Sequence, residues 1–271
     1  MDTPTLPADA PPPEPEPRGR YLPYSLPRRW VGDMLHAAHK VPVIACERVI
    51  RVKAMHELRR KTPRPPSWSS LMIKAMGLIS MKMPELRRAY LGFPWGRIYE
   101  SPYSVASVIF GRQFRGEEAT FFCPMLHPER LTVDKIGAKV QAWKTDPVEA
   151  HGALRRLVRN AKPPRPIRRA MWWFGLNWFG EMRARYFGTF AVNSVASIGG
   201  RMLQFATPLT QVLYYGAVNR DGEMLIQFAF DHRVYDGITV ALASVRLEEV
   251  LNNELIEEVK ALPAARAAVG G

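Results

Sequence analysis

The chain has 271 residues, of which 47% are hydrophobic and 23% charged, a composition typical of one large or two small globular domains. This composition excludes a chain disordered throughout, a collagen-like chain and a sustained coiled coil. The longest apolar stretches are about half of the roughly 20 residues that a spanning helix needs, and the N-terminus lacks the pattern of a secretory signal. Two cysteines are too few for a disulfide framework or a structural zinc site, so we expect a cytoplasmic protein without a metal.

The net charge of +13 is concentrated in one segment. Residues 152–185 contain nine lysines and arginines against a single acid, Glu181. The rest of the chain is only mildly basic, so we interpret the charge as a local feature. Nucleic acid ranks last among the partners considered.

Both ends of the chain have compositions that do not favour packing. Residues 9–17, DAPPPEPEP, alternate proline with carboxylates, a pattern of extended and solvated chain. We therefore expect a disordered tail over residues 1–20 and a folded domain over residues 21–256. The alanine-rich run after Pro263 predicts a flexible C-terminal end over residues 257–271.

The first half of the domain alternates helix and strand signals. The apolar spacing and the flanking residues predict a helix over 27–39, a strand over 42–53, a buried helix over 70–83, strands over 104–110 and 119–123, and an amphipathic helix over 131–143. The helix over 70–83 is apolar on all sides, which is typical of a helix inside the core.

After the basic segment, strand signals return. The pattern predicts strands over 189–195, 212–217 and 224–230, followed by a helix over 239–256 with its leucines and valines facing inward. No internal repeat of 20–50 residues is visible. The expected fold class is α/β, with a mixed sheet flanked by helices in a single domain.

The strongest chemical signal is the run FAFDHRVYDG at residues 228–237. His232 directly follows an apolar strand, Asp236 comes four residues later, and Gly237 is expected to let the chain turn tightly into the next helix. An imidazole titrating near neutrality suits a general base for a thiol or hydroxyl nucleophile.

This run resembles the active-site signature of the acyltransferase core of 2-oxoacid dehydrogenase complexes and, more distantly, of chloramphenicol acetyltransferase. Further blocks resemble the same family in its own order: YLPYSLPRRW at 21–30, SSLMIKAMGLISMKMPELRRAY at 69–90, FGTFAVNSVASIGG at 187–200 and TPLTQVLYYGAVNRD at 207–221. The resemblance covers residues 21–252. It implies a chloramphenicol acetyltransferase-like fold and a homotrimer, with larger cages built from trimers in some members.

The resemblance also implies a thioester exchange. The histidine matching His232 deprotonates the thiol of coenzyme A or dihydrolipoamide, and the position matching Asp236 pairs with an arginine of the opening helix, here Arg28. A hydroxyl on a strand of the neighbouring subunit stabilises the oxyanion. No segment of this sequence resembles a lipoyl domain, so coenzyme A is the expected cosubstrate and a lipoyl group would come from another protein.

The sequence departs from the family at the oxyanion position. The strand motif places Asn193 where the family has serine or threonine, with Ser194 one residue later on the opposite strand face. We favour the Asn193 side chain as the donor. A one-residue bulge would instead bring Ser194 into place, and a third interpretation is an impaired oxyanion site.

The segment over 152–186 is an insertion relative to the family. Its centre, AMWWFGLNWFG at 170–180, is rich in aromatic residues and has arginines on both sides. We favour packing against a neighbouring subunit or over a substrate channel. Tryptophans between arginines are also typical of a segment lying on an anionic membrane, here over residues 165–186.

These observations predict an acyltransferase that moves an acyl group between a coenzyme A thioester and a thiol or hydroxyl acceptor. Two alternatives stay open. One is a structural scaffold or cage of the same fold with weakened catalysis, which the change at Asn193 favours. The other is a membrane-surface acyltransferase that uses the aromatic insertion.

Overall fold

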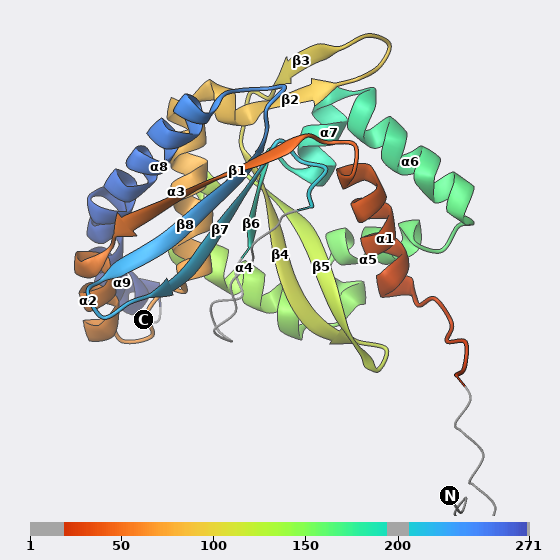
Figure 1. Ribbon diagram of the computed structural model, residues 1–271. Coiled ribbons are helices and arrows are strands. Elements are labelled where there is room, and N and C mark those ends of the chain that lie inside the picture. The colour runs from red at the N-terminus through yellow and green to blue at the C-terminus, as the bar shows by residue number, and fades with distance from the viewer. Residues whose placement is uncertain (1–18, 194–205, 270–271) are drawn as a thin grey trace, which may run out of the picture.

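A six-stranded mixed sheet forms the centre of the computed structural model, which describes residues 19–193 and 206–269 (Figure 1). The strand order is β1-β8-β7-β6-β4-β5. Its strands are β1 (Val43–Arg51), β4 (Val105–Phe114), β5 (Glu117–Leu126), β6 (Phe190–Asn193), β7 (Gln211–Val218) and β8 (Glu223–Asp231). The short strand β6 runs parallel to both of its neighbours, whereas β1–β8, β7–β8 and β4–β5 are antiparallel. This mixed sheet confirms the expected fold class.

Four helices, over residues 26–38, 68–82, 133–145 and 237–252, arise where the apolar spacing predicts a helix. The helices of the described residues are α1 (Leu26–Ala38), α2 (Lys53–Lys61), α3 (Trp68–Lys82), α4 (Val133–Thr145), α5 (Gly152–Asn160), α6 (Arg165–Asn177), α7 (Gly180–Phe187), α8 (Gly237–Asn252) and α9 (Glu254–Val269), with short 3-10 turns η1 (Pro84–Arg87), η2 (Pro128–Arg130) and η3 (Val148–Ala150). Ser25, Ser67 and Thr132 cap α1, α3 and α4 by accepting a hydrogen bond from a backbone amide in the first turn.

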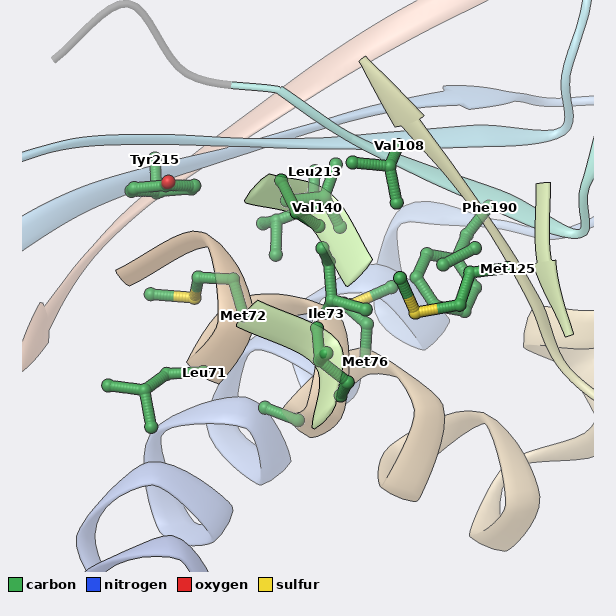
Figure 2. Close-up of a cluster of buried hydrophobic side chains, with 14 of the residues drawn as sticks. Leu71, Met72, Ile73, Met76, Val108, Met125, Val140, Phe190, Leu213 and Tyr215 are labelled. Atoms are coloured by element: carbon green, nitrogen blue, oxygen red, sulfur yellow. The ribbon is translucent and has the colours of Figure 1, made fainter. Parts of the chain in front are cut away.

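Helix α3 lies against one face of the sheet and supplies the centre of the core (Figure 2). Met72, Ile73 and Met76 are fully buried and point toward side chains of the strands and of α4, among them Val108 and Val140. Each buried side chain of this size stabilises the fold by about 1.5–3 kcal/mol. The all-round apolar helix predicted from the sequence is confirmed.

Helices α5, α6 and α7 are formed by the basic segment that the sequence analysis interprets as an insertion, and they stand beside the β4–β5 end of the sheet with α1 (Figure 1). Not all of its cations face solvent. Arg168 and Arg169 of α6 place their Nε atoms 2.7 and 3.2 Å from the buried carboxylate of Asp33 on α1. Arg183 of α7 is also buried. Part of the basic segment therefore holds α6 against α1 through buried ion pairs.

The C-terminal end differs from its prediction. Helix α8 ends at Asn252 and α9 follows it up to residue 269, so residues 257–262 belong to a packed helix and differ from the flexible end predicted over residues 257–271. Leu255, Val259 and Leu262 recur every three or four residues and are buried in the core. That spacing is the signal of a packed helix face, and the alanine-rich composition after it hid the signal.

Several shorter elements were not predicted, among them α2, β2 (Arg88–Leu91) and β3 (Arg97–Glu100). The strand expected over 42–53 ends at Arg51, and α2 begins at Lys53. Strands β2 and β3 form a separate hairpin above the main sheet (Figure 1). Both strands have four residues, which is too short for an alternating pattern to be visible in a sequence.

Candidate active site

His232 is held at the end of β8, between β1 and β7 in the sheet. Its backbone N–H donates to the carbonyl of Pro42 at 3.4 Å, just before β1 begins. The residue before it, Asp231, is fully buried, but the side chain of His232 is 43% exposed. A rigid, buried strand therefore presents an accessible imidazole at its end.

Asp236 faces this imidazole from the start of α8. Its Oδ1 lies 3.2 Å from Nδ1 of His232, and its side chain makes no capping hydrogen bond to the helix. A carboxylate in this place favours the tautomer that carries its proton on Nδ1. The lone pair of Nε2 is then free to accept a proton, which is the requirement for a general base.

Two further residues hold the turn between β8 and α8. Asp231 accepts hydrogen bonds from the backbone N, Nε and Nη2 of Arg233, at 3.1, 2.9 and 2.7 Å. The hydrogen bond to Asp231 raises the pKa of Arg233, whose guanidinium lies 4.3 Å from the ring centroid of Tyr90. Sequence reasoning missed this pair. Its signal was an aspartate and an arginine flanking His232 on the same side of the chain.

Arg183 reinforces the same region from α7. Its guanidinium donates to the carbonyls of Tyr90, Leu176 and Pro208 at 2.9, 2.9 and 3.1 Å. Burial lowers the pKa of Arg183 to about 10, and the charge of Asp231 opposes that shift. One cation thus ties β2, α6 and the segment before β7 together behind the turn that carries His232.

The expected roles of Arg28 and Gly237 are not found within one chain. Arg28 lies exposed in the first turn of α1, and among the described residues the carboxylate of Asp236 is paired with His232 instead. Gly237 is the first residue of α8, has no left-handed backbone conformation, and a Cβ at this position would meet no atom within 4 Å. The backbone of this turn therefore makes no use of the conformational freedom of a glycine.

Asn193 is the last residue of β6, and Ser194 lies outside the described residues. The Asn193 position forms part of the walls of two cavities. The first, which we call the helix-side cavity, has a volume of about 560 Å³ and lies under α3 and α4. Its polar lining includes Lys144 and a hydroxyl pair, with Oγ of Ser69 2.6 Å from the phenol oxygen of Tyr215.

The second, which we call the outer cavity, has a volume of about 590 Å³ and lies on the opposite face of the sheet. Helix α1 contributes Met34 and Leu35, β5 contributes Phe122, and the insertion contributes Trp172. The ring of Trp172 packs edge-on against Phe122, with centroids 6.0 Å apart. The aromatic segment over 152–186 thus forms part of a cavity wall, and its place over a substrate channel stays a prediction.

Strand register separates Asn193 from His232 within one chain. Asn193 pairs with Tyr214, and Tyr214 pairs with Gln227, five residues before His232. With a rise of about 3.3 Å per residue and a spacing of about 4.8 Å between strands, the two Cα atoms are on the order of 19 Å apart. This distance exceeds the combined reach of the side chains, so one chain alone does not bring base and donor together.

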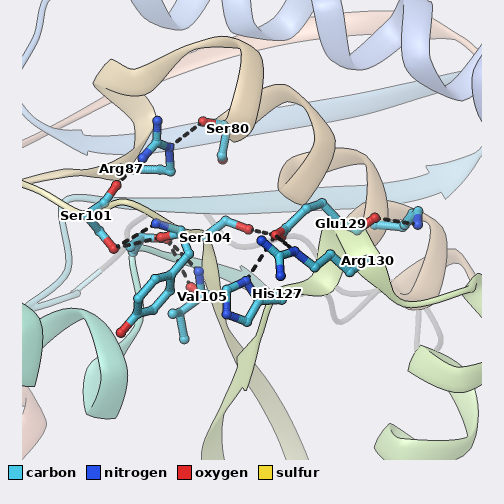
Figure 3. Close-up of polar contacts among 11 residues, drawn as sticks. Ser80, Arg87, Ser101, Ser104, Val105, His127, Glu129 and Arg130 are labelled. Carbon is cyan, nitrogen blue, oxygen red and sulfur yellow. Dashed lines mark hydrogen bonds and ion pairs between the residues drawn. The ribbon is translucent and has the colours of Figure 1, made fainter.

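A second polar cluster also contains a serine, a carboxylate and a histidine (Figure 3). Ser104 donates to Glu129, and Nδ1 of His127 lies 3.3 Å from the other carboxylate oxygen. The carboxylate stands between the two other groups, so His127 does not take the serine's proton, and Ser104 is fully buried. Nearby, Arg87 donates to the carbonyls of Ser80 and Ser101. This cluster stabilises the fold and is not a nucleophilic site.

The described residues contain no group of three or more histidine, cysteine or acidic side chains that could hold a metal ion. Within the same part of the chain, each helix is too short or too polar to cross a bilayer.

No family model and no curated protein match the sequence. Solved structures do match. A probable dihydrolipoamide acetyltransferase of Listeria monocytogenes is 14% identical with a TM-score of 0.61, covering 86% of this chain and 94% of its own. A dihydrolipoamide acetyltransferase of Azotobacter vinelandii, studied for the catalytic roles of a serine, a histidine and an asparagine, is 14% identical with a TM-score of 0.62, covering 90% and 98%.

A catalytic core of the 2-oxoacid dehydrogenase complex of Thermoplasma acidophilum is 16% identical, with a TM-score of 0.62 and coverage of 87% of this chain and 99% of its own. The fold expected from the sequence motifs is thereby confirmed. The chain has the fold of the acyltransferase cores of 2-oxoacid dehydrogenase complexes.

Proposed function

We propose that the protein is an acyltransferase that moves an acyl group between a coenzyme A thioester and a thiol or hydroxyl acceptor. The observation that carries this proposal is the pair of cavities on opposite faces of the sheet, both lined by Asn193. A transferase must bring two substrates to one reacting centre from separate binding sites. Asn193 is where two such sites adjoin in this chain.

The lining of each cavity suits a different substrate. The helix-side cavity carries Lys144 and the Ser69–Tyr215 hydroxyl pair, which fit the amides and phosphates of coenzyme A. The outer cavity is walled by α1 and Trp172 and is mainly apolar, which fits the hydrocarbon part of an acceptor. A lipoyl group carried by another protein and a small apolar thiol or alcohol both meet that description.

His232 acts as the general base in this proposal. Its Nε2 takes the proton from the acceptor thiol or hydroxyl, and the acceptor sulfur or oxygen forms a bond to the thioester carbonyl carbon. When the tetrahedral intermediate collapses, the carbon–sulfur bond to coenzyme A breaks and the thiolate recovers the proton from His232. Asp236 holds Nδ1 during both transfers.

Asn193 is the proposed oxyanion donor. The side-chain N–H of an asparagine can stabilise a tetrahedral oxyanion, and the loss of such a donor costs about 10²–10³ in rate. Because Asn193 and His232 are far apart in one chain, we infer that the donor and the base come from neighbouring copies. A homotrimer, with a cage of trimers as its extension, supplies this arrangement.

The surface beside His232 supports a contact between copies. Ile238 and Leu242, on the first two turns of α8, are 76% and 55% exposed. Two apolar side chains on the same helix face, next to an exposed catalytic histidine, favour burial against another chain. In a closed ring, each copy would give its His232 to one neighbour and its Asn193 to the other.

A complementation experiment tests the shared site. His232→Ala should lower transfer from acetyl-coenzyme A to dihydrolipoamide by about 10²–10⁴, and Asn193→Ala by about 10²–10³. When the two inactive variants are unfolded, mixed in equal amounts and refolded together, about one quarter of the sites should regain both groups. Each variant refolded alone is the control.

Failure to regain activity in the mixed assemblies would contradict the shared site. Calorimetric titration with coenzyme A separates this failure from a wrong function, because His232→Ala should still bind coenzyme A. If the wild type neither binds coenzyme A nor transfers acyl groups, and light scattering shows a large closed assembly, the scaffold alternative is supported instead.

A further inference from the structure

Helix α6 turns two of its arginines toward the protein and exposes several of its apolar side chains. Arg168 and Arg169 face α1, where they pair with Asp33. Ile167, Met171 and Phe174 follow one another at intervals of four and three residues, and all three are exposed. A surface helix ordinarily turns such a stripe toward the core. From Ile167 to Phe174 the stripe of α6 is about 10 Å long at about 1.5 Å per residue.

Aromatic side chains extend this stripe over the β2–β3 hairpin. The ring of Phe93 lies 5.5 Å from Trp173 and 4.4 Å from Trp178, between ring centroids. Trp95, two residues further along the hairpin loop, is 69% exposed, and Phe179 after α6 is 55% exposed. We call this surface the aromatic face, made of Phe93, Trp95, Ile167, Met171, Trp173, Phe174, Trp178 and Phe179.

Cations stand at both ends of the aromatic face. Lys162 and Arg165 are exposed at the start of α6. At the other end, Arg97 donates to the carbonyl of Trp178 at 2.8 Å, and Arg97 and Arg185 line a hollow of about 600 Å³ together with Phe179. Among residues 152–187 the only acid is Glu181, which lines the same hollow. The rim of the apolar surface is therefore strongly basic.

We propose that the aromatic face binds the surface of a lipid bilayer that contains anionic lipids. Tryptophan and phenylalanine beside arginine form the combination that enters the boundary between headgroups and acyl chains, and each cation near an anionic surface adds about fivefold in affinity. A second copy fits less well, because two such faces would bring their arginines together. The described helices are too short or too polar to span a bilayer, so the protein would lie on the membrane. This inference does not depend on acyl transfer.

Vesicle flotation tests the proposal on the full chain. We expect the wild type to float with phosphatidylcholine vesicles that contain about 30% phosphatidylglycerol and to float poorly with phosphatidylcholine alone. Phe174→Glu should lower the vesicle partition coefficient at least about tenfold, and the double variant Arg97→Glu/Arg185→Glu at least about 25-fold. Val49→Glu, at an exposed apolar position on β1, is the matched control and should float like the wild type.

Trp95→Ala is a second variant of the aromatic face. Because the Trp95 side chain lies exposed on a loop, its removal should leave the fold intact, and this variant should also float less than the wild type. The proposal is refuted if the wild type does not float with anionic vesicles. It is also refuted if Phe174→Glu and Trp95→Ala both float as well as Val49→Glu. If the wild type does not bind vesicles and light scattering shows that Phe174→Glu or Trp95→Ala changes the mass of the assembly, the aromatic face is a contact between copies. That result would overturn the membrane proposal.

Discussion

Replacing Asp33 should be among the most destabilising changes in the protein. Its side chain is 2% exposed, and its carboxylate has Nε of Arg168 at 2.7 Å and Nε of Arg169 at 3.2 Å. Asp33→Ala leaves two guanidinium groups in the helix contact without a counter-charge. The Coulomb term for charges about 4 Å apart at an effective dielectric constant of about 20 is roughly 4 kcal/mol. Breaking a buried pair in this way costs about 3–5 kcal/mol.

Urea unfolding followed by tryptophan fluorescence measures this cost. Glu254→Ala is the matched control, since its partner Lys82 lies 2.6 Å away in a solvent-exposed pair whose loss costs at most about 1 kcal/mol. The double variant Asp33→Leu/Arg168→Met should be less destabilised than Asp33→Leu alone, because it removes the uncompensated charge together with its partner. A loss below about 1 kcal/mol for Asp33→Ala would refute the account of a buried tie between α1 and α6.

Three further predictions concern the surroundings of the site. Arg183→Met should cost about 3–5 kcal/mol, seen as a lower midpoint in urea, because it leaves three buried carbonyls without their donor; a loss below about 1 kcal/mol would contradict this. Gly180→Ala should cost about 1–3 kcal/mol, because the new Cβ would lie 2.0 Å from the ring of Tyr99; an unchanged midpoint would show that the hairpin moves freely. Burial raises the pKa of Cys123 to about 12, so at pH 8 a thiol reagent should label Cys46 and reach Cys123 only after unfolding; equal labelling rates in the native protein would contradict this.

Short-range patterns were sufficient to predict most of the strands and four of the helices, and they indicated His232 as a candidate site residue. The strand ending at Asp231 and the buried helix α3 were predicted within a few residues, because alternation and helical spacing are local properties of a chain. His232 was identified for the same reason, since its place directly after an apolar strand is visible in the sequence. The motifs also led to the fold, which the solved structures confirm.

Local patterns were not sufficient where a role depends on the conformation of a turn or on contacts between remote residues. Arg28 does not reach Asp236 within one chain, and the backbone of the turn before α8 makes no use of the conformational freedom of Gly237. Helix α9 was not predicted, because Leu255, Val259 and Leu262 are recognisable as a buried helix face only when the core that packs against them is known. Asn193 stays a prediction as the oxyanion donor, and Ser194 lies outside the described residues.

The sequence by itself was sufficient to predict the helices and strands that have a regular apolar period, and it indicated His232 as the candidate base. Only the tertiary structure decided where the charges and the apolar residues of the insertion point. A helical period is the same whichever face is buried, so the pattern of α6 does not reveal that its arginines turn inward to Asp33. The distance between Asn193 and His232 is likewise a property of strand register, which pairs residues remote in the chain and therefore leaves no local signal.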